Sequence, residues 1–140
     1  MNKTKGFTII ELIVVVAIIA VLAAIVSVNV ITYLNKGKDA AIKSNLETAQ
    51  TAMVALADSS GGITATSCDS GDLKNAVDAA GVAGSATNTK CYDATGAAAV
   101  CAQLKADTGK YFCVDSIGNK KEITAAAGTC ASLWAVTVCP

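Results

Sequence analysis

The chain has 140 residues, 53% of them hydrophobic, with 11 basic and 11 acidic side chains and no histidine. High hydrophobicity at zero net charge argues against intrinsic disorder, and the length fits one domain of ordinary size. The balanced charge offers no overall basic surface to nucleic acid, and the lack of histidine excludes Ser-His-Asp triads, Cys-His dyads and HExxH metal sites. The sequence also shows no Gly-rich phosphate loop, EF-hand or paired catalytic carboxylates, and we expect a non-enzymatic protein with no catalytic residue, metal or other cofactor.

The N-terminal segment is a short basic stretch followed by a long apolar run. From Phe7 to Ile31 the polar side chains are only Thr8, Glu11, Ser27 and Asn29. As an α-helix this run would span roughly 37 Å, enough to cross a hydrocarbon layer of about 30 Å with some tilt. The segment is therefore predicted to be a membrane helix or an export signal. Neither a plain anchor nor a cleavable secretory signal gives the acidic Glu11 a purpose.

Residues 6–12, Gly-Phe-Thr-Ile-Ile-Glu-Leu, resemble the class III signal of type IV pilins and type II secretion pseudopilins. The resemblance implies that a prepilin peptidase cleaves between Gly6 and Phe7, and that the new N-terminal Phe7 is methylated. It further implies that Glu11 recruits and registers incoming subunits. The physical basis is attraction between the carboxylate and the freshly exposed amine, of the same chain or of a neighbouring copy.

A second helical pattern follows the apolar run. Asp39 and Lys43 have the i, i+4 spacing and order that favour an ion pair, and residues 58–62 are turn formers that end the pattern. We predict one helix over about 7–58 whose first half protrudes from the folded part, with two helices hinged at 35–37 as the alternative. An amphipathic stripe recurs at spacings of three and four: Ile42, Leu46, Ala49, Met53 and Leu56.

The remaining residues, 61–140, are rich in small side chains and need that stripe to complete a core. A small antiparallel sheet is expected to pack on Ile42, Leu46, Met53 and Leu56. The predicted short helices are 72–80, capped by Asp69 or Ser70 and stopped by Gly81, and 97–106. The predicted strands are 111–116 and 122–124, which form a hairpin, and 131–138.

All six cysteines lie in the second half of the chain: Cys68, Cys91, Cys101, Cys113, Cys130 and Cys139. They contain no C-x-x-C pair, so a disulfide framework in an oxidising compartment is favoured over a zinc or redox site. Six cysteines allow fifteen pairings, and the spacing does not choose among them. The cysteines place the second half outside the cytoplasm. The pilin resemblance implies a Cys130–Cys139 loop.

The predicted architecture is α+β and pilin-like: a long N-terminal helix with a disulfide-stapled antiparallel sheet packed on its second half. Its predicted parts are a cleaved leader (1–6), a transmembrane and filament-core helix (7–34), an amphipathic second half (35–60) and a small globular head (61–140).

The resemblance implies a structural subunit of a type IV pilus-like filament, first in the cytoplasmic membrane and then at the cell surface. The implied partners are further copies of the chain, prepilin peptidase, the membrane assembly machinery and, before assembly, membrane lipid. One alternative is a pseudopilin or minor pilin of a type II secretion or DNA-uptake system. The other is a secreted disulfide-rich binding domain, whose ordinary signal peptide would end near Ala24.

Overall fold

A computed structural model describes residues 6–58, 62–84, 88–124 and 137–139. The chain divides into two compact units, Met1–Leu34 and Asn35–Pro140. Helix α1 (Ile9–Asp58) contributes to both of them, and residues 35–37 are helical. The predicted single helix is therefore confirmed, and the alternative of two helices separated at 35–37 is wrong.

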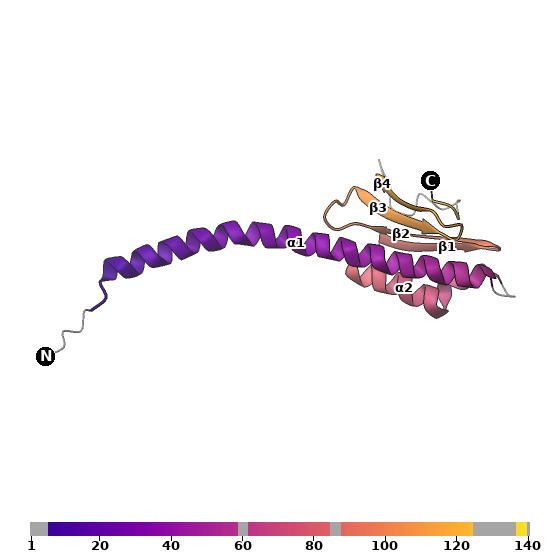
Figure 1. Ribbon diagram of the computed structural model, residues 1–140, viewed down its shortest axis with the longest axis horizontal. Coiled ribbons are helices and arrows are strands. Elements are labelled where there is room, and N and C mark those ends of the chain that lie inside the picture. Colours follow the sequence, from indigo (N-terminus) through magenta and orange to yellow (C-terminus); the bar gives the residue numbers. More distant parts are fainter. Residues whose placement is uncertain (1–5, 59–61, 85–87, 125–136, 140) are drawn as a thin grey trace. The chain divides into compact units, whose positions relative to one another are not determined.

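The first unit consists mainly of the first half of α1 (Figure 1). This half is rich in aliphatic residues and contains no proline, because the one proline of the chain is Pro140. The large apolar side chains that the structure describes in this half are between 46% and 80% exposed. The helix is thus stabilised by its own backbone hydrogen bonds, and its side chains are left available for another apolar surface.

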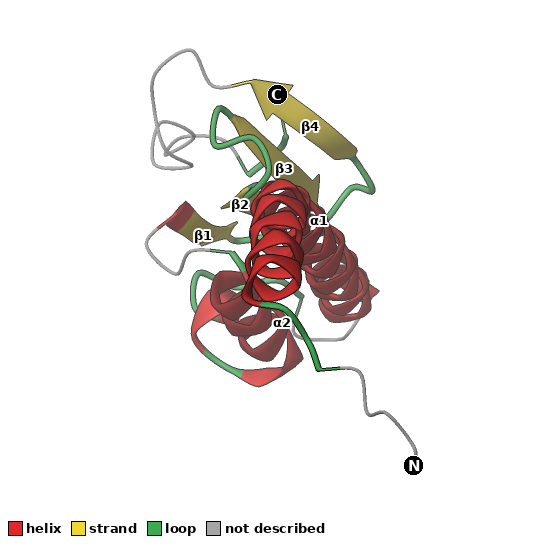
Figure 2. Ribbon diagram, turned by 90° about the vertical axis from the view of Figure 1, so that its left-hand side faces the viewer, coloured by secondary structure: helices red, strands yellow, loops and turns green. Residues whose placement is uncertain are grey.

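The second unit combines the second half of α1 with helix α2 (Gly71–Ala83) and a four-stranded antiparallel sheet (Figure 2). A short 3-10 helix, η1 (Ser67–Asp69), precedes α2. The strands follow the order β1-β2-β3-β4, so each pairs with its neighbour in sequence. Their bounds are β1 (Thr89–Ala94), β2 (Ala97–Gln103), β3 (Lys110–Asp115) and β4 (Lys120–Thr124).

The two faces of the sheet are buried by different partners. Val100, Phe112 and Val114 face the main core. The alternate residues Cys101, Tyr111 and Cys113 form a second cluster with Cys139. The predicted packing of the sheet on the amphipathic stripe is confirmed, since the core holds these residues of α1: Ile42, Leu46, Ala49 and Met53, with Leu56 half-buried against them.

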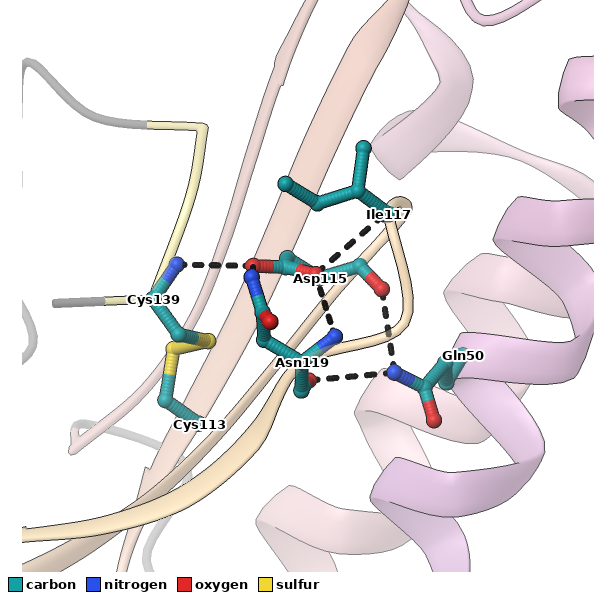
Figure 3. The surroundings of a disulfide bond; sticks show 6 residues. All are labelled: Gln50, Cys113, Asp115, Ile117, Asn119 and Cys139. Atoms are coloured by element: carbon teal, nitrogen blue, oxygen red, sulfur yellow. Dashed lines mark hydrogen bonds between the residues drawn. A yellow bond between two sulfur atoms is a disulfide. The ribbon is translucent and has the colours of Figure 1, made fainter.

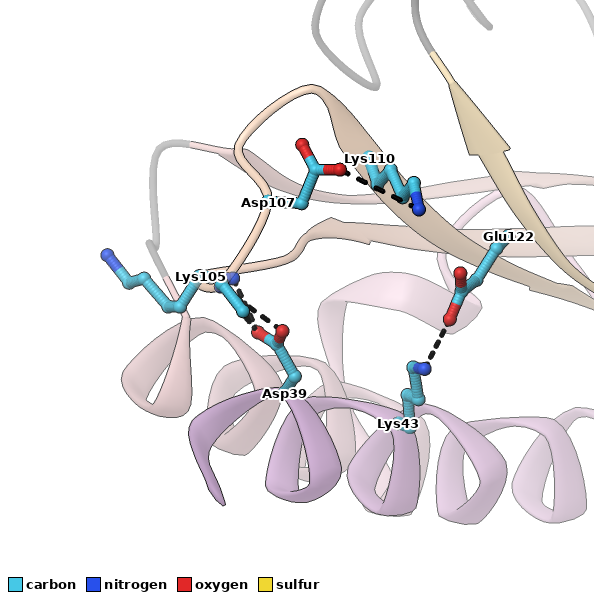
Figure 4. Close-up of polar contacts among 7 residues, drawn as sticks. Asp39, Lys43, Lys105, Asp107, Lys110 and Glu122 are labelled. Carbon is cyan, nitrogen blue, oxygen red and sulfur yellow. Dashed lines mark hydrogen bonds and ion pairs between the residues drawn. The ribbon is translucent and has the colours of Figure 1, made fainter. Parts of the chain in front are cut away.

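Polar contacts also join the strands to α1 (Figure 4). The Asp39 carboxylate accepts hydrogen bonds from the backbone N–H groups of Lys105 and Ala106, which follow β2. Lys43 pairs with Glu122 of β4 instead of with Asp39. The predicted i, i+4 pair within α1 is therefore wrong, because Asp39 bonds to the segment after β2 and Lys43 pairs with a residue of β4.

The sequence predictions for the second unit succeed at one hairpin and fail at one helix. The 111–116 and 122–124 hairpin is confirmed as β3 and β4, and the first short helix is present as α2. However, α2 continues through Gly81 to Ala83, and its C-cap is Gly84, whose N–H bonds to the Ala80 carbonyl. The predicted strand at 131–138 falls mostly outside the described residues.

The segment 97–106 is not a helix, since residues 97–103 form strand β2. Thr95 and Gly96 make a two-residue hairpin turn between the paired Ala94 and Ala97, and Gly96 has a φ of 85° that suits such a turn. Alanine favours helices locally. Here β2 pairs on both sides and is buried on both faces, and tertiary packing overrides this preference.

Candidate processing and assembly segment

The predicted cleavage junction lies ahead of the first helix. Gly6, Phe7 and Thr8 are exposed and non-helical, and the Phe7 side chain is 75% exposed. A Cβ atom built on Gly6 would meet nothing within 4 Å. The fold of the described residues therefore places no steric demand for glycine here, and a glycine requirement would have to come from an enzyme that binds the extended junction.

Thr8 and Glu11 form a reciprocal cap at the start of α1. The backbone N–H and the hydroxyl of Thr8 donate to Glu11 Oε2 at 2.9 and 2.8 Å, and the Glu11 N–H donates to Thr8 Oγ1 at 3.3 Å. This is the capping-box arrangement, which satisfies N–H groups that the first helical turn leaves unpaired. A Thr-x-x-Glu sequence ahead of an apolar run is the signal for this cap, which Glu11 forms in addition to its predicted role in assembly.

The cap also bears on the electrostatics of the segment. The donors from Thr8 both converge on Oε2, and within the described residues no hydrogen bond reaches Oε1 of Glu11. The carboxylate is exposed and has capacity for a further donor. One helical turn from the predicted new N-terminus, Glu11 can accept a hydrogen bond from an amine while it still caps the helix.

The apolar surface of the first half of α1 is long enough to cross a membrane. Within the described residues, Ile9–Ala57 is the one helix that meets this criterion, and its most apolar 18-residue window has a mean hydropathy of 3.3 with none of it buried. A core helix of a soluble protein would be mostly buried. An ordinary secretory signal sequence passes the same test, so the residues around the junction have to distinguish a retained membrane helix from a cleaved signal.

The cysteines form a disulfide framework in the second unit. Cys68 is bonded to Cys91 and Cys113 to Cys139, and Cys101 is also disulfide-bonded. The Cys130–Cys139 loop implied by the pilin resemblance is wrong, because Cys139 pairs with Cys113 on β3. Cys130 itself lies outside the described residues. The first bridge joins η1 to β1, so each bridge links segments that are distant in sequence.

A buried carboxylate that was not predicted from the sequence lies beside the second bridge (Figure 3). Asp115, at the end of β3, is fully buried and accepts four hydrogen bonds. Three come from the β3–β4 turn, through the N–H groups of Ile117 and Asn119 and the side-chain amide of Asn119. The fourth comes from the Cys139 N–H at 3.0 Å. An aspartate that precedes a turn often bonds backbone N–H groups two residues on, and this was the available signal.

Gln50 connects the same turn to α1. Its side-chain amide donates to the carbonyls of Asp115 and Asn119 at 3.1 and 3.0 Å. The turn, the C-terminal cysteine and the helix therefore meet around one satisfied cluster, which is a structural arrangement. Among the described residues no group of three or more histidine, cysteine, aspartate or glutamate side chains is placed to hold a metal ion.

Comparison with protein families identifies the N-terminal segment. Residues 1–27 match the prokaryotic N-terminal methylation motif. The match includes Gly6, Phe7 and Glu11, so this segment is a class III signal of the type carried by type IV pilins and pseudopilins, and the resemblance found in the sequence is confirmed. Neither a curated protein nor a solved structure matches the chain. The α+β fold of long helix and antiparallel sheet is pilin-like.

Proposed function

We propose that this chain is a structural, non-enzymatic subunit of a type IV pilus-like extracellular filament. In this proposal, prepilin peptidase cleaves between Gly6 and Phe7, Phe7 is methylated, and copies assemble through the first half of α1. The observation that carries the proposal is a methylation motif joined to the first half of α1, whose described large apolar side chains are all exposed from Ile9 to Leu34.

The apolar surface supports assembly on physical grounds. A continuous hydrophobic helix is stable in lipid, and outside lipid it is stable only when another apolar surface covers it. Other copies of the same helix provide such a surface. Glu11 then gives each incoming copy a charged group that meets the amine of a neighbour, because cleavage places a positive charge on every Phe7.

The disulfides support export of the second unit. Structural disulfides persist in oxidising compartments, and this unit has no free cysteine among its described residues. The precursor is accordingly proposed to lie in the cytoplasmic membrane with its leader inside, and the mature chain at the cell surface. The proposed partners are further copies, the peptidase, the assembly machinery and, before assembly, lipid.

A pseudopilin or minor pilin of a type II secretion or DNA-uptake system is the alternative assignment, because it would carry the same signal. Negative-stain microscopy of sheared surface material separates the two assignments. Long filaments built mainly from this chain support a major pilin, whereas its absence from sheared filaments, with the processed chain retained in the membrane, supports a pseudopilin.

Mass spectrometry of the mature N-terminus tests processing directly. The expected product begins with N-methylated Phe7. In Gly6→Val the precursor should persist with residues 1–6 attached, which gel mobility detects, while Gly37→Ala, a helical glycine with open space at its Cβ, is the matched control and should be processed normally. A mature chain that starts near Ala24 would instead support the secreted binding domain.

A further inference from the structure

One face of α1 carries a row of aliphatic side chains with a polar side chain at each end, and we call this row the seam. Glu11 and Asn29 are 18 residues apart, about five turns at 3.6 residues per turn, and so share a face. On this face, four aliphatic residues lie between them at alternating spacings of four and three, and their side chains are 46–60% exposed. This is the spacing at which helices pack against each other. The seam consists of Glu11, Val15, Ile18, Leu22, Ile25 and Asn29.

The surface of the seam has a hollow of the kind that helix packing requires. Beside Ile18 and Leu22 there is a shallow hollow, whose other lining residues are Ala17 and Val21. Every residue of this lining is apolar, and the small Ala17 side chain leaves room above it. A protruding aliphatic side chain from another helix fits such a hollow in knobs-into-holes packing.

Asn29 differs from the other polar side chains of residues 8–32 in having no partner within the described chain. Thr8 and Glu11 bond each other, and the Ser27 hydroxyl donates to the Ala23 carbonyl at 2.8 Å. Thr32 also has a partner. The Asn29 carboxamide is exposed and has two donors and an acceptor to satisfy.

The surroundings of Asn29 change between membrane and filament. Twenty helical residues from Ile9 span about 30 Å, which puts Asn29 at the outer boundary of a hydrocarbon layer, within reach of water and headgroups. In a bundle of apolar helices the same amide is removed from water. An amide buried without a hydrogen bond is strongly unfavourable, so the bundle has to supply a partner.

We propose that Asn29 is a register-determining residue, whose carboxamide hydrogen-bonds to a second copy of this chain across the seam. The inference rests on the proposed filament function. A single asparagine in an apolar helix interface selects the register in which it is satisfied, because every shifted register leaves it unpaired. Glu11 fixes one end of the seam by charge, and Asn29 fixes the other by hydrogen bonding.

A second copy fits the seam better than lipid does. Acyl chains can cover the four aliphatic residues, but they cannot bond the carboxamide. A neighbouring copy presents the same aliphatic residues together with the carboxamide, hydroxyl and backbone carbonyl groups of its own segment 27–35.

The test compares filaments of the whole chain and three variants by cryo-electron microscopy. Asn29→Leu should insert and be processed normally, but its filaments should lose the single helical lattice and give several sets of layer lines or broadened ones. Asn29→Gln retains the carboxamide and should restore the parental lattice. Ser27→Ala is the matched control, because the Ser27 hydroxyl is already satisfied by its own helix, and it should leave the lattice unchanged.

Unchanged order in Asn29→Leu filaments, or equal disorder in the Leu and Gln variants, would overturn the role of the carboxamide. Loss of Asn29→Leu filaments with recovery in Asn29→Gln would support it. If the processed, unmodified chain forms no filament, the proposed filament function is wrong, and the proposed role of Asn29 in setting the register is wrong with it.

Discussion

At the scale of single residues, the two carboxylates that matter most are used in opposite ways. Asp115 is fully buried and takes four hydrogen bonds from one turn and from Cys139. Glu11 is exposed and takes its bonds from the neighbouring Thr8. The first arrangement is complete within the second unit, while the second leaves a charge available at the end of a helix.

Substitutions of Glu11 should distinguish its role in capping the helix from the role of its negative charge in assembly. Gln retains an oxygen that accepts from the Thr8 N–H, as capping boxes with Gln do, but it carries no charge, whereas Ala removes both features. If the charge serves assembly, Glu11→Gln and Glu11→Ala should both insert normally and both be incorporated into filaments much less than the unmodified chain. Quantitative immunoblotting of membrane and sheared fractions measures this. Near-normal incorporation of Glu11→Gln would instead assign the role to the cap.

Asp115→Ala should destabilise the second unit by about 3 kcal/mol or more, because it leaves several buried N–H groups without an acceptor. Urea unfolding of the whole chain in detergent, followed by circular dichroism, measures the change. Asp107→Ala is the control, since Asp107 is exposed and makes a surface ion pair with Lys110. Its effect should stay below about 1 kcal/mol. Similar losses for both variants would contradict the special role of the Asp115 cluster.

At the scale of elements, small polar contacts fix how β4 lies against α1. Lys43 pairs with Glu122, and its ammonium also lies 5.7 Å from the ring centroid of Phe112. Lys120 pairs with Glu47 at 3.4 Å. These pairs are on the surface, so each adds modestly to stability, but they connect an edge of the described sheet to the helix that forms its core.

Glu122 should give the second unit a small dependence on acidic pH. The hydrogen bond and the positive charge of Lys43 lower the pKa of Glu122 below its ordinary value of 4.5. Folding thus favours the deprotonated form, and this stabilisation is present above pH 4.5 and is lost as the pH falls through the lowered pKa. Both side chains are more than a third exposed, so we expect about 0.2–1 kcal/mol.

The measurement for Glu122 is the unfolding free energy between pH 3 and pH 7, in the unmodified chain and in Glu122→Gln. The difference between the two chains should grow as the pH rises through this range and then level off. A difference that is the same at every pH would show that the ionisation of Glu122 does not contribute.

At the scale of the whole molecule, the two units have surfaces with different requirements. The first exposes aliphatic side chains along residues 9–34, and the second buries its aliphatic residues in the core around Ile42 and Val100. The unit boundary at Leu34 and Asn35 falls where the apolar run gives way to lysines. The requirement for lipid or for other copies therefore belongs to the first unit.

A chain of residues 35–140, exported to an oxidising compartment, should be a soluble monomer with its disulfides formed. Sedimentation velocity measures its size, and mass spectrometry its disulfide content. The full mature chain, as the comparison, should need detergent or assemble. Oligomers of the short chain at micromolar concentration would place part of the assembly surface in the second unit.

Much of the candidate site was predictable, because its signals are local. The junction at Gly6 and Phe7 and the acid at Glu11 are read along a few consecutive residues, and the apolar run follows directly. The core-facing stripe of α1 was predictable for a similar reason, since helical periodicity repeats within one element. Asn29 was visible as a polar residue in the run, but its lack of a partner became clear only when the hydrogen bonds of its neighbours were known.

The sequence by itself determined the class III signal, the long helix and the core-facing stripe, because short-range spacing encodes each of them. Only the tertiary structure decided the strand at 97–103, the pairing of Cys113 with Cys139, the partners of Asp39 and Lys43, and the burial of Asp115. These features depend on contacts between residues distant in the chain. Many such contacts are compatible with one sequence, and packing, hydrogen bonding and chain connectivity together select among them.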